Sequence, residues 1–226
     1  MTAKRRYAVV GVGSRSRMYT GGIAGSHAEH AELVALCDTN LCRAELRKRE
    51  LGEAFADVPV YPAGDFERMV SEARPDVVIV TTVDVTHSDY IVRALELGRD
   101  VVAEKPMTID AARCEAILRA WRDTGRDVQV TFNYRYAPSR SQVKELLDEG
   151  RIGRPLGVDF HWMLDTRHGA DYFRRWHRHR ANSGSLLVHK ATHHFDLVNW
   201  WLGARPVEVF CRGRRAFYTP RTADEL

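Results

Sequence analysis

The sequence has few cysteines, no long apolar run and little excess charge, and each absence excludes a class of protein. Its 4 cysteines form no CxxC pair and show no metal-ligand spacing, so neither a dithiol redox site nor a zinc module is indicated. We expect Cys37 and Cys114 to be buried thiols in a reducing compartment. The apolar run after the basic N-terminal residues breaks at Gly11 and Gly13, which argues against a signal peptide or a membrane span. The sequence therefore predicts a cytoplasmic protein without a membrane partner.

The charge of the chain is also mild. The net charge is +4, and only 5 of the 34 basic residues are lysines. A nucleic-acid-binding protein would carry a basic face with base-stacking aromatic residues in a known module, and none is found. We therefore expect no nucleic-acid partner. The 44% hydrophobic and 28% charged content is that of an ordinary globular protein, and 226 residues suffice for one large or two small domains.

Between residues 6 and 132, apolar runs alternate with helical patterns. Runs rich in valine without polar alternation indicate strands buried on both faces, as in a parallel sheet. Repeated strand–helix units of this kind predict a doubly wound α/β domain, which we assign to residues 1–133. The predicted strands are Tyr7–Val10, Leu33–Cys37, Val58–Tyr61, Val77–Thr81, Val101–Ala103 and Val128–Phe132. The predicted helices are Leu41–Leu51, Asp65–Ala73, His87–Leu97 and Ile109–Asp123.

After Tyr134 this rhythm changes, and residues 134–226 are predicted to form a second, α+β domain. Two predicted strands leave open sheet edges and a thin core, so this domain is expected to be partial. Its predicted elements are a helix over Ser139–Glu149, a strand over Leu156–Leu164, an arginine- and histidine-rich loop over Asp165–Ser183, a helix from about Gly184 to Leu202 and a strand over Val207–Arg212.

A glycine turn, Gly11-x-Gly13-x-x-Ser16, follows the first predicted strand, where a dinucleotide fingerprint opens a helix. Gly11 permits the tight turn, Gly13 lets the backbone approach a pyrophosphate, and free N–H groups at the helix N-terminus can bind it. Ser16 replaces a third glycine and holds the helix slightly farther from the strand. Ser14 is expected to contact the cofactor, and Arg15 or Arg17 can add a phosphate contact. A glycine turn without a ligand is the alternative.

Asp38 ends the second predicted strand, 25 residues after Gly13. A carboxylate at this place accepts hydrogen bonds from both ribose hydroxyls and repels a 2′-phosphate. The predicted cofactor is therefore NAD, in preference to NADP.

The charged step Glu104-Lys105-Pro106 follows the strand over Val101–Ala103, at the sheet edge where ligands bind in such folds. Pro106 restrains Lys105 and admits a cis peptide bond. The Lys105 ammonium can hydrogen-bond a substrate hydroxyl and stabilise the alkoxide that develops as hydride leaves. A surface lysine paired with Glu104 is the alternative.

Thr82 and His87 follow the strand over Val77–Thr81 and lie at the same edge, where His87 and Asp84 can line a cofactor cleft. Asp84 or Thr86 fits the cap of the following helix equally well. The residues expected to contact the dinucleotide are Gly11, Gly13, Ser14, Arg15, Ser16, Asp38, Thr82, His87, Glu104 and Lys105.

A polar stripe on one face of the last predicted helix consists of His189, His193, Asp196 and Trp200. A histidine general base fits this stripe because the imidazole pKa lies near neutrality, and Asp196 can orient it or cap a nearby group. The two histidines are spaced as in zinc proteases, but Lys190 takes the place of the glutamate, so no metal is predicted. Histidines that fill a polar core face are a further alternative.

Tyr172, Phe173 and Trp176 lie among the arginines of residues 167–180. Aromatic rings suit the apolar faces of a sugar, and arginines suit its hydroxyls or an acid group. A solvated basic loop is the alternative.

Together these residues resemble the Gfo/Idh/MocA family, named for glucose–fructose oxidoreductase and inositol dehydrogenase. The family implies a Rossmann domain followed by an open, mostly antiparallel sheet domain, and oxidation or reduction of a pyranose or cyclitol with NAD(P). It also implies a homo-oligomer where that sheet is complete. Family chains are longer, so the sheet domain is expected to be truncated here. The resemblance rests on Gly11-x-Gly13, Asp38, Thr82…His87, Glu104-Lys105-Pro106, Asn133-Tyr-Arg135-Tyr136 and His193-x-x-Asp196 followed by Trp-Trp-Leu-Gly203.

By position, Lys105 matches the family's active-site lysine and His193 its catalytic histidine. The family's aspartate four residues earlier is His189 here, so either His189 is the proton relay or Lys190 enters the site. The hypothesis is an NAD(P)-dependent oxidoreductase acting on a sugar, sugar derivative or cyclitol. The alternatives are an NAD-dependent glycoside hydrolase acting by transient oxidation and a non-catalytic nucleotide-binding protein. The residues expected to contact the substrate are Lys105, Arg135, Tyr172, Trp176, His189, Lys190 and His193.

Overall fold

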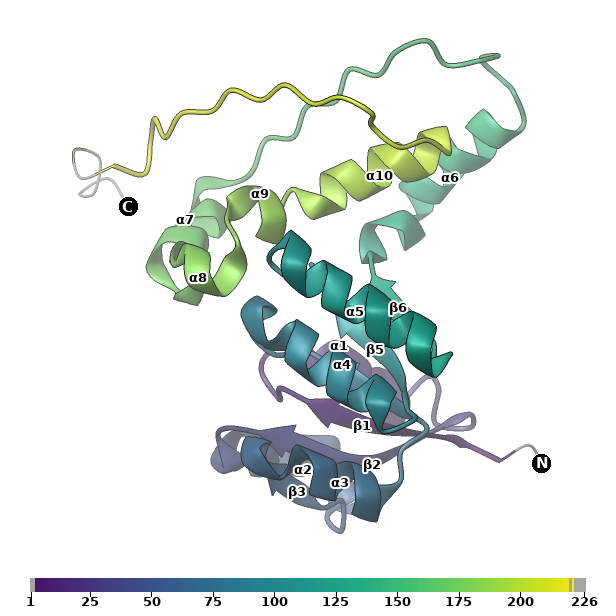
Figure 1. Ribbon diagram of the computed structural model, residues 1–226, viewed down its shortest axis with the longest axis vertical. Helices are drawn as coiled ribbons and strands as arrows, with labels where there is room; N and C mark the ends of the chain where they lie inside the picture. Colours follow the sequence, from purple (N-terminus) through teal and green to yellow (C-terminus); the bar gives the residue numbers. More distant parts are fainter. Residues whose placement is uncertain (1–2, 220, 222–226) are drawn as a thin grey trace. The chain divides into compact units, whose positions relative to one another are not determined.

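Six parallel strands form one sheet in the first part of the chain, in the order β3-β2-β1-β4-β5-β6 (Figure 1). The computed structural model describes residues 3–219 and 221. Every predicted strand of this sheet is confirmed, with bounds that differ by at most two residues. The strands are β1 Arg5–Val10, β2 Ala31–Asp38, β3 Val60–Pro62, β4 Val77–Val80, β5 Asp100–Glu104 and β6 Val128–Thr131.

Helices connect these strands and cover both faces of the sheet, which confirms the doubly wound α/β prediction. Asn40 begins the second helix because its side chain accepts a hydrogen bond from the Arg43 N–H. The helix predicted over Asp65–Ala73 starts at Phe66, one residue later than expected. The helices are α1 Ser16–Ala24, α2 Leu41–Leu51, α3 Phe66–Ala73, α4 His87–Glu96 and α5 Ala111–Thr124. Short 3-10 helices span Glu53–Phe55, Ala63–Asp65 and Asp84–Thr86.

Alternate residues of the central strands enter two separate hydrophobic cores. Ala8 and Val10 of β1 pack in a cluster with Phe66 of α3, while Val9 packs in the other cluster with Ile23 of α1. All five side chains are at most 7% exposed. Because both faces of β1 are buried, its sequence shows no polar alternation, which is why the valine-rich pattern identified the strand.

The strand order reverses between β1 and its neighbour β4. Strand β2 leaves β1 in one direction, and β4 and β5 extend the sheet in the other. In open parallel sheets, ligands bind at such a switch point, outside the carboxyl ends of the strands. The residues that follow β1, β2, β4 and β5 therefore form one candidate site.

The chain divides into two units, the first ending at Thr131 and the second beginning at Phe132. In the second unit, Trp201 Nε1 donates to the Arg140 carbonyl oxygen at 2.9 Å and so joins the last helix to the first. The helices of this unit are α6 Pro138–Asp148, α7 Thr166–Arg174, α8 Arg180–Ser183, α9 Leu186–His189 and α10 Thr192–Leu202, with 3-10 helices over Asn133–Tyr136 and Trp176–Arg178.

The strands predicted over Leu156–Leu164 and Val207–Arg212 are wrong for the part of the chain that the structure describes. Both segments lack regular secondary structure, so no sheet is present in the described residues of this unit. A strand is defined by its ladder partner, and an apolar alternating pattern does not supply one. Leu156 is 93% exposed and Val207 97% exposed, so no described segment covers either side chain.

Two further expectations for the second unit are wrong. The segment Asp165–Ser183 is mostly helical, because the Asp165 side chain accepts hydrogen bonds from the N–H groups of Arg167 and His168 and starts α7. The single helix expected from about Gly184 to Leu202 is two helices, α9 and α10, separated at residues 190–191.

The two cysteines predicted to be buried differ in their exposure to solvent. Cys37 on β2 is fully buried, and burial together with the nearby Asp38 raises the pKa of its thiol to about 12. Cys114 is only half-buried, because α5 turns little more than Ile117 and Ala120 into the core. None of the helices in the described residues is long and apolar enough to span a bilayer.

Candidate functional site

The first position of the turn after β1 has room for no residue other than glycine. Gly11 has a φ of +87°, and a Cβ placed on it would lie 2.6 Å from the backbone nitrogen of Thr82. A side chain is therefore excluded by both the backbone conformation and the loop after β4. Gly13 differs, because a Cβ there would have no atom within 4 Å. The turn thus packs against the neighbouring loop at Gly11 and faces open space at Gly13.

This turn presents backbone donors to that space. Within residues 3–219, the N–H groups of Gly13, Ser14 and Arg15 donate no hydrogen bond, and α1 has no acidic residue in its first turn. Unpaired N–H groups at a helix N-terminus form an anion site. The residues present therefore fit a dinucleotide pyrophosphate. Ser16 supports the turn from inside, since its hydroxyl donates to the Gly13 carbonyl at 2.7 Å and its side chain is fully buried.

Asp38 is held beside the glycine turn at the end of β2. Its Oδ2 accepts from the Val12 N–H at 2.6 Å, and its Oδ1 accepts from the Asn40 N–H at 2.7 Å. The Arg43 guanidinium lies 3.4 Å from Oδ1. The carboxylate is thus anchored where β1 and β2 end, next to the space in front of Gly13.

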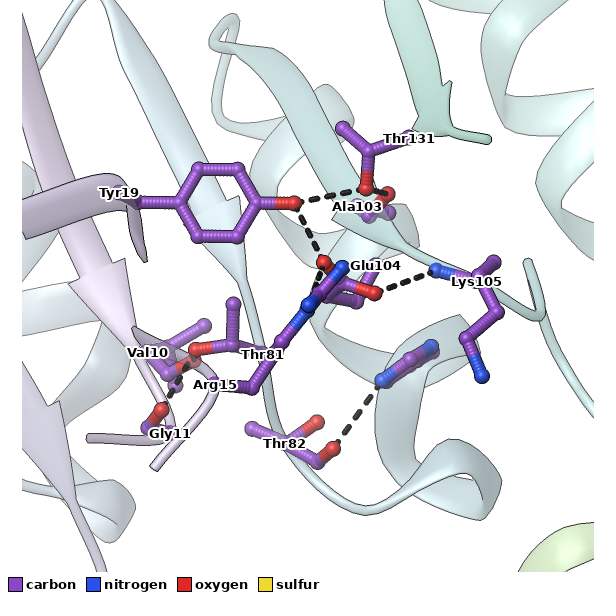
Figure 2. A network of polar contacts seen from close by, with 11 residues as sticks. Val10, Gly11, Arg15, Tyr19, Thr81, Thr82, Ala103, Glu104, Lys105 and Thr131 are labelled. Carbon is purple, nitrogen blue, oxygen red and sulfur yellow. Dashed lines mark hydrogen bonds and ion pairs between the residues drawn. The ribbon is translucent and has the colours of Figure 1, made fainter. Parts of the chain in front are cut away.

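Glu104 at the end of β5 is the centre of a buried polar network (Figure 2). Its Oε1 accepts from Arg15 Nε at 2.5 Å and from the Tyr19 hydroxyl at 2.8 Å. Its Oε2 accepts from the backbone N–H of Lys105 at 3.2 Å. The Tyr19 hydroxyl also contacts Thr131 Oγ1 at 2.7 Å, and Thr131 lies opposite Glu104 on β6. The network ties α1, β5 and β6 together at the carboxyl ends of the two strands.

This network bears on two expectations from the sequence, one for Arg15 and one for Glu104. Arg15 was expected to contact a phosphate, and in the structure its guanidinium pairs with Glu104. The Glu104 carboxylate therefore has a partner on the glycine turn, and it also holds the Lys105 main chain. Figure 2 shows the Lys105 side chain directed away from Tyr19 and Thr131.

The Tyr19 hydroxyl is kept neutral by its surroundings. Burial, and next the negative charge of Glu104, raise the pKa of this phenol far above its ordinary value of 10.0. The folded protein therefore keeps a proton on Tyr19 at pH values where the unfolded chain loses it. Stability from this group is complete below pH 10 and is lost as the pH rises above it, because the unfolded state then binds fewer protons.

We expect Tyr19→Phe to remove part of the alkaline sensitivity of the fold. Between pH 9.5 and 11 the wild-type chain should lose about 1 kcal/mol more unfolding free energy than the variant, as one phenol with an unfolded pKa near 10 predicts. Urea unfolding across this pH range measures the difference. Tyr136→Phe is the matched control, since it removes one phenol hydroxyl at a position that is 73% exposed. Equal profiles for wild type and Tyr19→Phe would contradict the raised pKa of Tyr19 in the folded protein.

His87 joins the loops that follow β4 and β5. Its Nδ1 lies 2.8 Å from the Pro106 carbonyl oxygen and its Nε2 lies 3.2 Å from the Thr82 carbonyl oxygen. The Lys105–Pro106 peptide bond is cis, as the sequence allowed. The cap expected of Thr86 is wrong: it stands at the N-cap of α4, but its hydroxyl bonds Thr82 and Val83 rather than a helix N–H. This fully enclosed imidazole thus fixes the loop that carries Lys105.

In the second unit, His193 lies against an aromatic ring. It is 4% exposed and stacks on Tyr134 with ring centroids 4.0 Å apart. Lys190 Nζ donates to the hydroxyl of the same tyrosine at 3.0 Å. Tyr134, from the 3-10 helix Asn133–Tyr136, thus orients the imidazole and holds the Lys190 ammonium.

His189 has different neighbours, so the predicted helical face shared by His189 and His193 is wrong. The interruption between α9 and α10 removes the helical spacing on which that prediction rested. The His189 ring lies among Tyr172, Trp176 and His177, with centroids 5.5, 5.4 and 4.6 Å away. Among the described residues, no group of three or more His, Cys, Asp or Glu side chains is placed to hold a metal ion.

Asp196 pairs with Arg135, the basic residue of the Asn-Tyr-Arg-Tyr motif. Arg135 Nε donates to Asp196 Oδ2 at 2.8 Å, and Arg135 Nη2 donates to Oδ1. This two-bond pairing raises the pKa of the Arg135 guanidinium. The pair fastens the 3-10 helix that carries Tyr134 to α10, which carries His193.

The sequence did not indicate a role for three residues of these networks. Tyr19 and Thr131 carry no motif signal, because only the pairing of β6 with β5 brings Thr131 to Glu104. Tyr134 could have been found, since it lies inside the motif Asn133–Tyr136. Its stacking on His193 joins segments about sixty residues apart, and a linear pattern does not encode such a contact.

Two family models match the chain. The model described as "Oxidoreductase family, NAD-binding Rossmann fold" matches residues 5–132, and the model described as "Oxidoreductase family, C-terminal alpha/beta domain" matches residues 144–225. The two models describe the N-terminal and the C-terminal domain of the Gfo/Idh/MocA family.

Individual proteins agree with these models. YteT of Bacillus subtilis (strain 168) is 42% identical over 211 residues, which cover 93% of this chain and 49% of YteT. The scyllo-inositol 2-dehydrogenase (NAD(+)) of the same organism is 29% identical over 210 residues, 92% of this chain and 57% of that enzyme. A solved structure of scyllo-inositol dehydrogenase from Lactobacillus casei, with bound NAD(H) and scyllo-inositol, matches with a TM-score of 0.74 and 25% identity, over 89% of this chain and 57% of its own. The chain spans about half the length of the curated relatives it matches.

Proposed function

The chain belongs to the Gfo/Idh/MocA oxidoreductase family, and from this premise we propose that it is an NAD-dependent dehydrogenase. Its substrate is a sugar, a sugar derivative or a cyclitol, and the reaction moves a hydride between a carbinol carbon and the nicotinamide. The relatives named as inositol dehydrogenases, one of them with bound NAD(H), support this reaction class.

The observation that carries the proposal is the juxtaposition of the glycine turn with the loop that bears Lys105. Gly11 touches the loop after β4, and Arg15 of the glycine turn pairs with Glu104, the residue before Lys105. A dinucleotide bound at the turn therefore starts at the same sheet edge as an ammonium group, with only β4 between β1 and β5. Without that neighbour, the glycine turn would support nucleotide binding alone.

The first unit binds the cofactor in this proposal. The free N–H groups of the glycine turn hold the pyrophosphate, and Asp38, whose Oδ2 also accepts from the Val12 N–H, accepts the ribose hydroxyls. Arg15, Glu104 and His87 set the two loops at the carboxyl edge. The residues assigned to the cofactor side are Gly11, Gly13, Ser14, Arg15, Ser16, Asp38, Thr82, His87, Glu104 and Lys105.

The remaining steps belong to side chains of this chain. Lys105 donates a hydrogen bond to the reacting oxygen and stabilises its developing negative charge. His193 accepts the hydroxyl proton, with its ring held in place by Tyr134. His189 relays that proton or Lys190 supplies a further positive charge. Bound NAD supplies the hydride acceptor.

The second unit supplies the substrate side. Tyr172 and Trp176 offer ring faces to the apolar side of a sugar, and both lie beside His189. Arg135 acts through Asp196 and positions the segment that carries Tyr134. The residues assigned here are Arg135, Tyr172, Trp176, His189, Lys190 and His193.

Cofactor choice is the first test. Asp38 presents a negative charge where NADP carries its 2′-phosphate, so NAD should bind at least about tenfold more tightly than NADP, which corresponds to about 1.4 kcal/mol. Calorimetric titration of the 226-residue chain with both dinucleotides measures the ratio. Tighter binding of NADP would contradict the assignment of Asp38.

Turnover is the second part of the same test. With NAD present, myo-inositol, scyllo-inositol and a panel of aldoses should each be assayed for NADH absorbance. Net NADH formation with a free polyol supports the dehydrogenase. Cleavage of a glycoside without net NADH would favour the hydrolase instead, and saturable NAD binding without turnover would favour a nucleotide-binding protein.

A further inference from the structure

The glycine turn Gly11–Ser16 carries one charged side chain, Arg15. Its guanidinium pairs with Glu104 at the end of β5, with Nε 2.5 Å from Oε1 (Figure 2). In the sheet order, β4 lies between β1 and β5, so a side chain that joins the turn after β1 to the end of β5 spans the carboxyl end of β4. Arg15 therefore crosses the switch point of the sheet, where ligands bind in such folds.

The two side chains of this ion pair differ in their exposure. The Arg15 side chain is 41% exposed, whereas the Glu104 side chain is 5% exposed. Glu104 also accepts from the Tyr19 hydroxyl at 2.8 Å and from the Lys105 N–H at 3.2 Å. These bonds hold the carboxylate in place, so Arg15 is the partner that is able to move. When it moves, Glu104 keeps its bonds to Tyr19 and Lys105.

A bound dinucleotide offers Arg15 a second anion. A pyrophosphate carries negative charge on each phosphate, and a guanidinium binds phosphate oxygens with two parallel hydrogen bonds. Arg15 is the N-cap residue of α1, so it belongs to the same turn whose N–H groups fit the pyrophosphate. The guanidinium can therefore change partner by a rotation of its side chain alone, while the backbone of the turn stays in place.

We propose that Arg15 is a latch that exchanges Glu104 for the pyrophosphate of the cofactor. Without a dinucleotide, the Arg15–Glu104 latch ties the glycine turn to β5 across the end of β4. When the pyrophosphate binds, the guanidinium leaves Glu104 and clears the edge between the turn and Lys105. This inference rests on the part of the proposed function in which NAD binds at the glycine turn, and it assigns to Arg15 the control of that binding.

A double-mutant cycle on NAD affinity tests the exchange. Glu104→Gln removes the charge that competes for Arg15, so it should tighten NAD binding about tenfold. Arg15→Met should weaken binding only about threefold in the wild-type chain, because the lost phosphate contact is offset by the ion pair that no longer has to break. In the Glu104→Gln chain the same substitution should weaken binding about thirtyfold, since nothing offsets the loss.

Calorimetric titration of the four chains with NAD measures the cycle, and thermal unfolding checks that each chain is folded. An equal effect of Arg15→Met in both backgrounds would overturn the inference. Weaker or unchanged NAD binding by a folded Glu104→Gln chain would overturn it as well.

The matched control is an ion pair between the same two strands at their other ends. Arg5 begins β1 and Asp100 begins β5, and Arg5 Nη2 lies 2.6 Å from Asp100 Oδ2. Arg5→Met and Asp100→Asn, alone and combined, should leave NAD affinity within about twofold of wild type. A coupling as large as that between Arg15 and Glu104 would assign the effect to a general loosening of the sheet and overturn the latch.

Cofactor fragments identify the anion that takes the guanidinium. ADP-ribose has the pyrophosphate without the nicotinamide, and adenosine has neither. Glu104→Gln should tighten ADP-ribose binding about as much as NAD binding and should change adenosine binding less than about twofold. A tightening confined to NAD, or one shared by adenosine, would overturn the exchange with the pyrophosphate.

A crystal structure of the wild-type chain with ADP-ribose decides the matter without any variant. Arg15 should lie within about 3.2 Å of a phosphate oxygen, with Glu104 still bonded to Tyr19 and to the Lys105 N–H. A guanidinium that remains on Glu104 while ADP-ribose is bound would overturn the inference.

Failure of this inference and failure of the proposed function give different results. Coupling between Arg15 and Glu104 in NAD binding, without NADH formation from any polyol, would support the latch and refute the dehydrogenase. NADH formation by a chain in which Arg15→Met has the same effect on NAD affinity in both backgrounds would support the dehydrogenase and overturn the latch.

Discussion

Methionine in place of Lys105 is expected to slow polyol-dependent NADH formation about a thousandfold while leaving the affinity for NAD within about threefold. Methionine keeps much of the length and the apolar stem of lysine but removes the ammonium group that we assign to the reacting oxygen. The backbone N–H of residue 105 still donates to Glu104, so the loop should keep its conformation. Steady-state absorbance assays measure kcat/KM, and calorimetry measures the dissociation constant for NAD.

The control for this substitution is Lys144→Met. Lys144 lies on α6, where its Nζ pairs with Asp148 at 2.7 Å on the exposed surface. Surface pairs of this kind contribute little to stability, so both kcat/KM and NAD affinity should stay within about twofold of wild type. Activity of Lys105→Met within tenfold of wild type would remove Lys105 from the reacting centre.

Two alanine substitutions in the glycine turn are expected to separate folding from cofactor binding. Gly13→Ala should leave the thermal midpoint within about 2 °C, because a Cβ there meets no atom within 4 Å. It should nevertheless weaken NAD binding about ten- to a hundredfold, since the new methyl group occupies the space assigned to the pyrophosphate. Thermal unfolding and calorimetric titration of the same preparation measure the two effects.

Gly11→Ala should have the opposite pattern. Its Cβ would lie 2.6 Å from the Thr82 backbone nitrogen, and its φ of +87° is unfavourable for an L-residue. Together, backbone strain and overpacking should cost about 2–5 kcal/mol of unfolding free energy. If Gly13→Ala binds NAD as tightly as wild type, the pyrophosphate does not lie at this turn. A stable Gly11→Ala would show that the β1 and β4 loops are not in contact.

The first unit was predictable because each of its elements carries its own signal. Strand β4 is four consecutive apolar residues, Val77–Val80, and α2 begins at a side-chain cap and ends at a glycine. Local propensity, burial pattern and turn chemistry agree at these places, so the sequence leaves few alternatives. The glycine turn, Asp38 and Lys105 could be placed at one sheet edge for the same reason.

The second unit was predicted less well because its elements depend on partners. The expected strand Leu156–Leu164 has an apolar pattern but no ladder in the described chain. The helices α8 and α9 have four residues each, too short to be stable without tertiary contacts. A periodic pattern of polar residues across residues 189–200 could not reveal the break between α9 and α10.

The amino-acid sequence by itself determined the parallel α/β fold, the glycine turn and the position of a lysine after β5, because these features depend on local propensity and on strand periodicity. Only the tertiary structure decided which side chains meet: Glu104 with Tyr19, Tyr134 with His193 and Arg135 with Asp196. The physical reason is that such contacts depend on strand order and helix packing. They join residues tens of positions apart, and no local pattern specifies them.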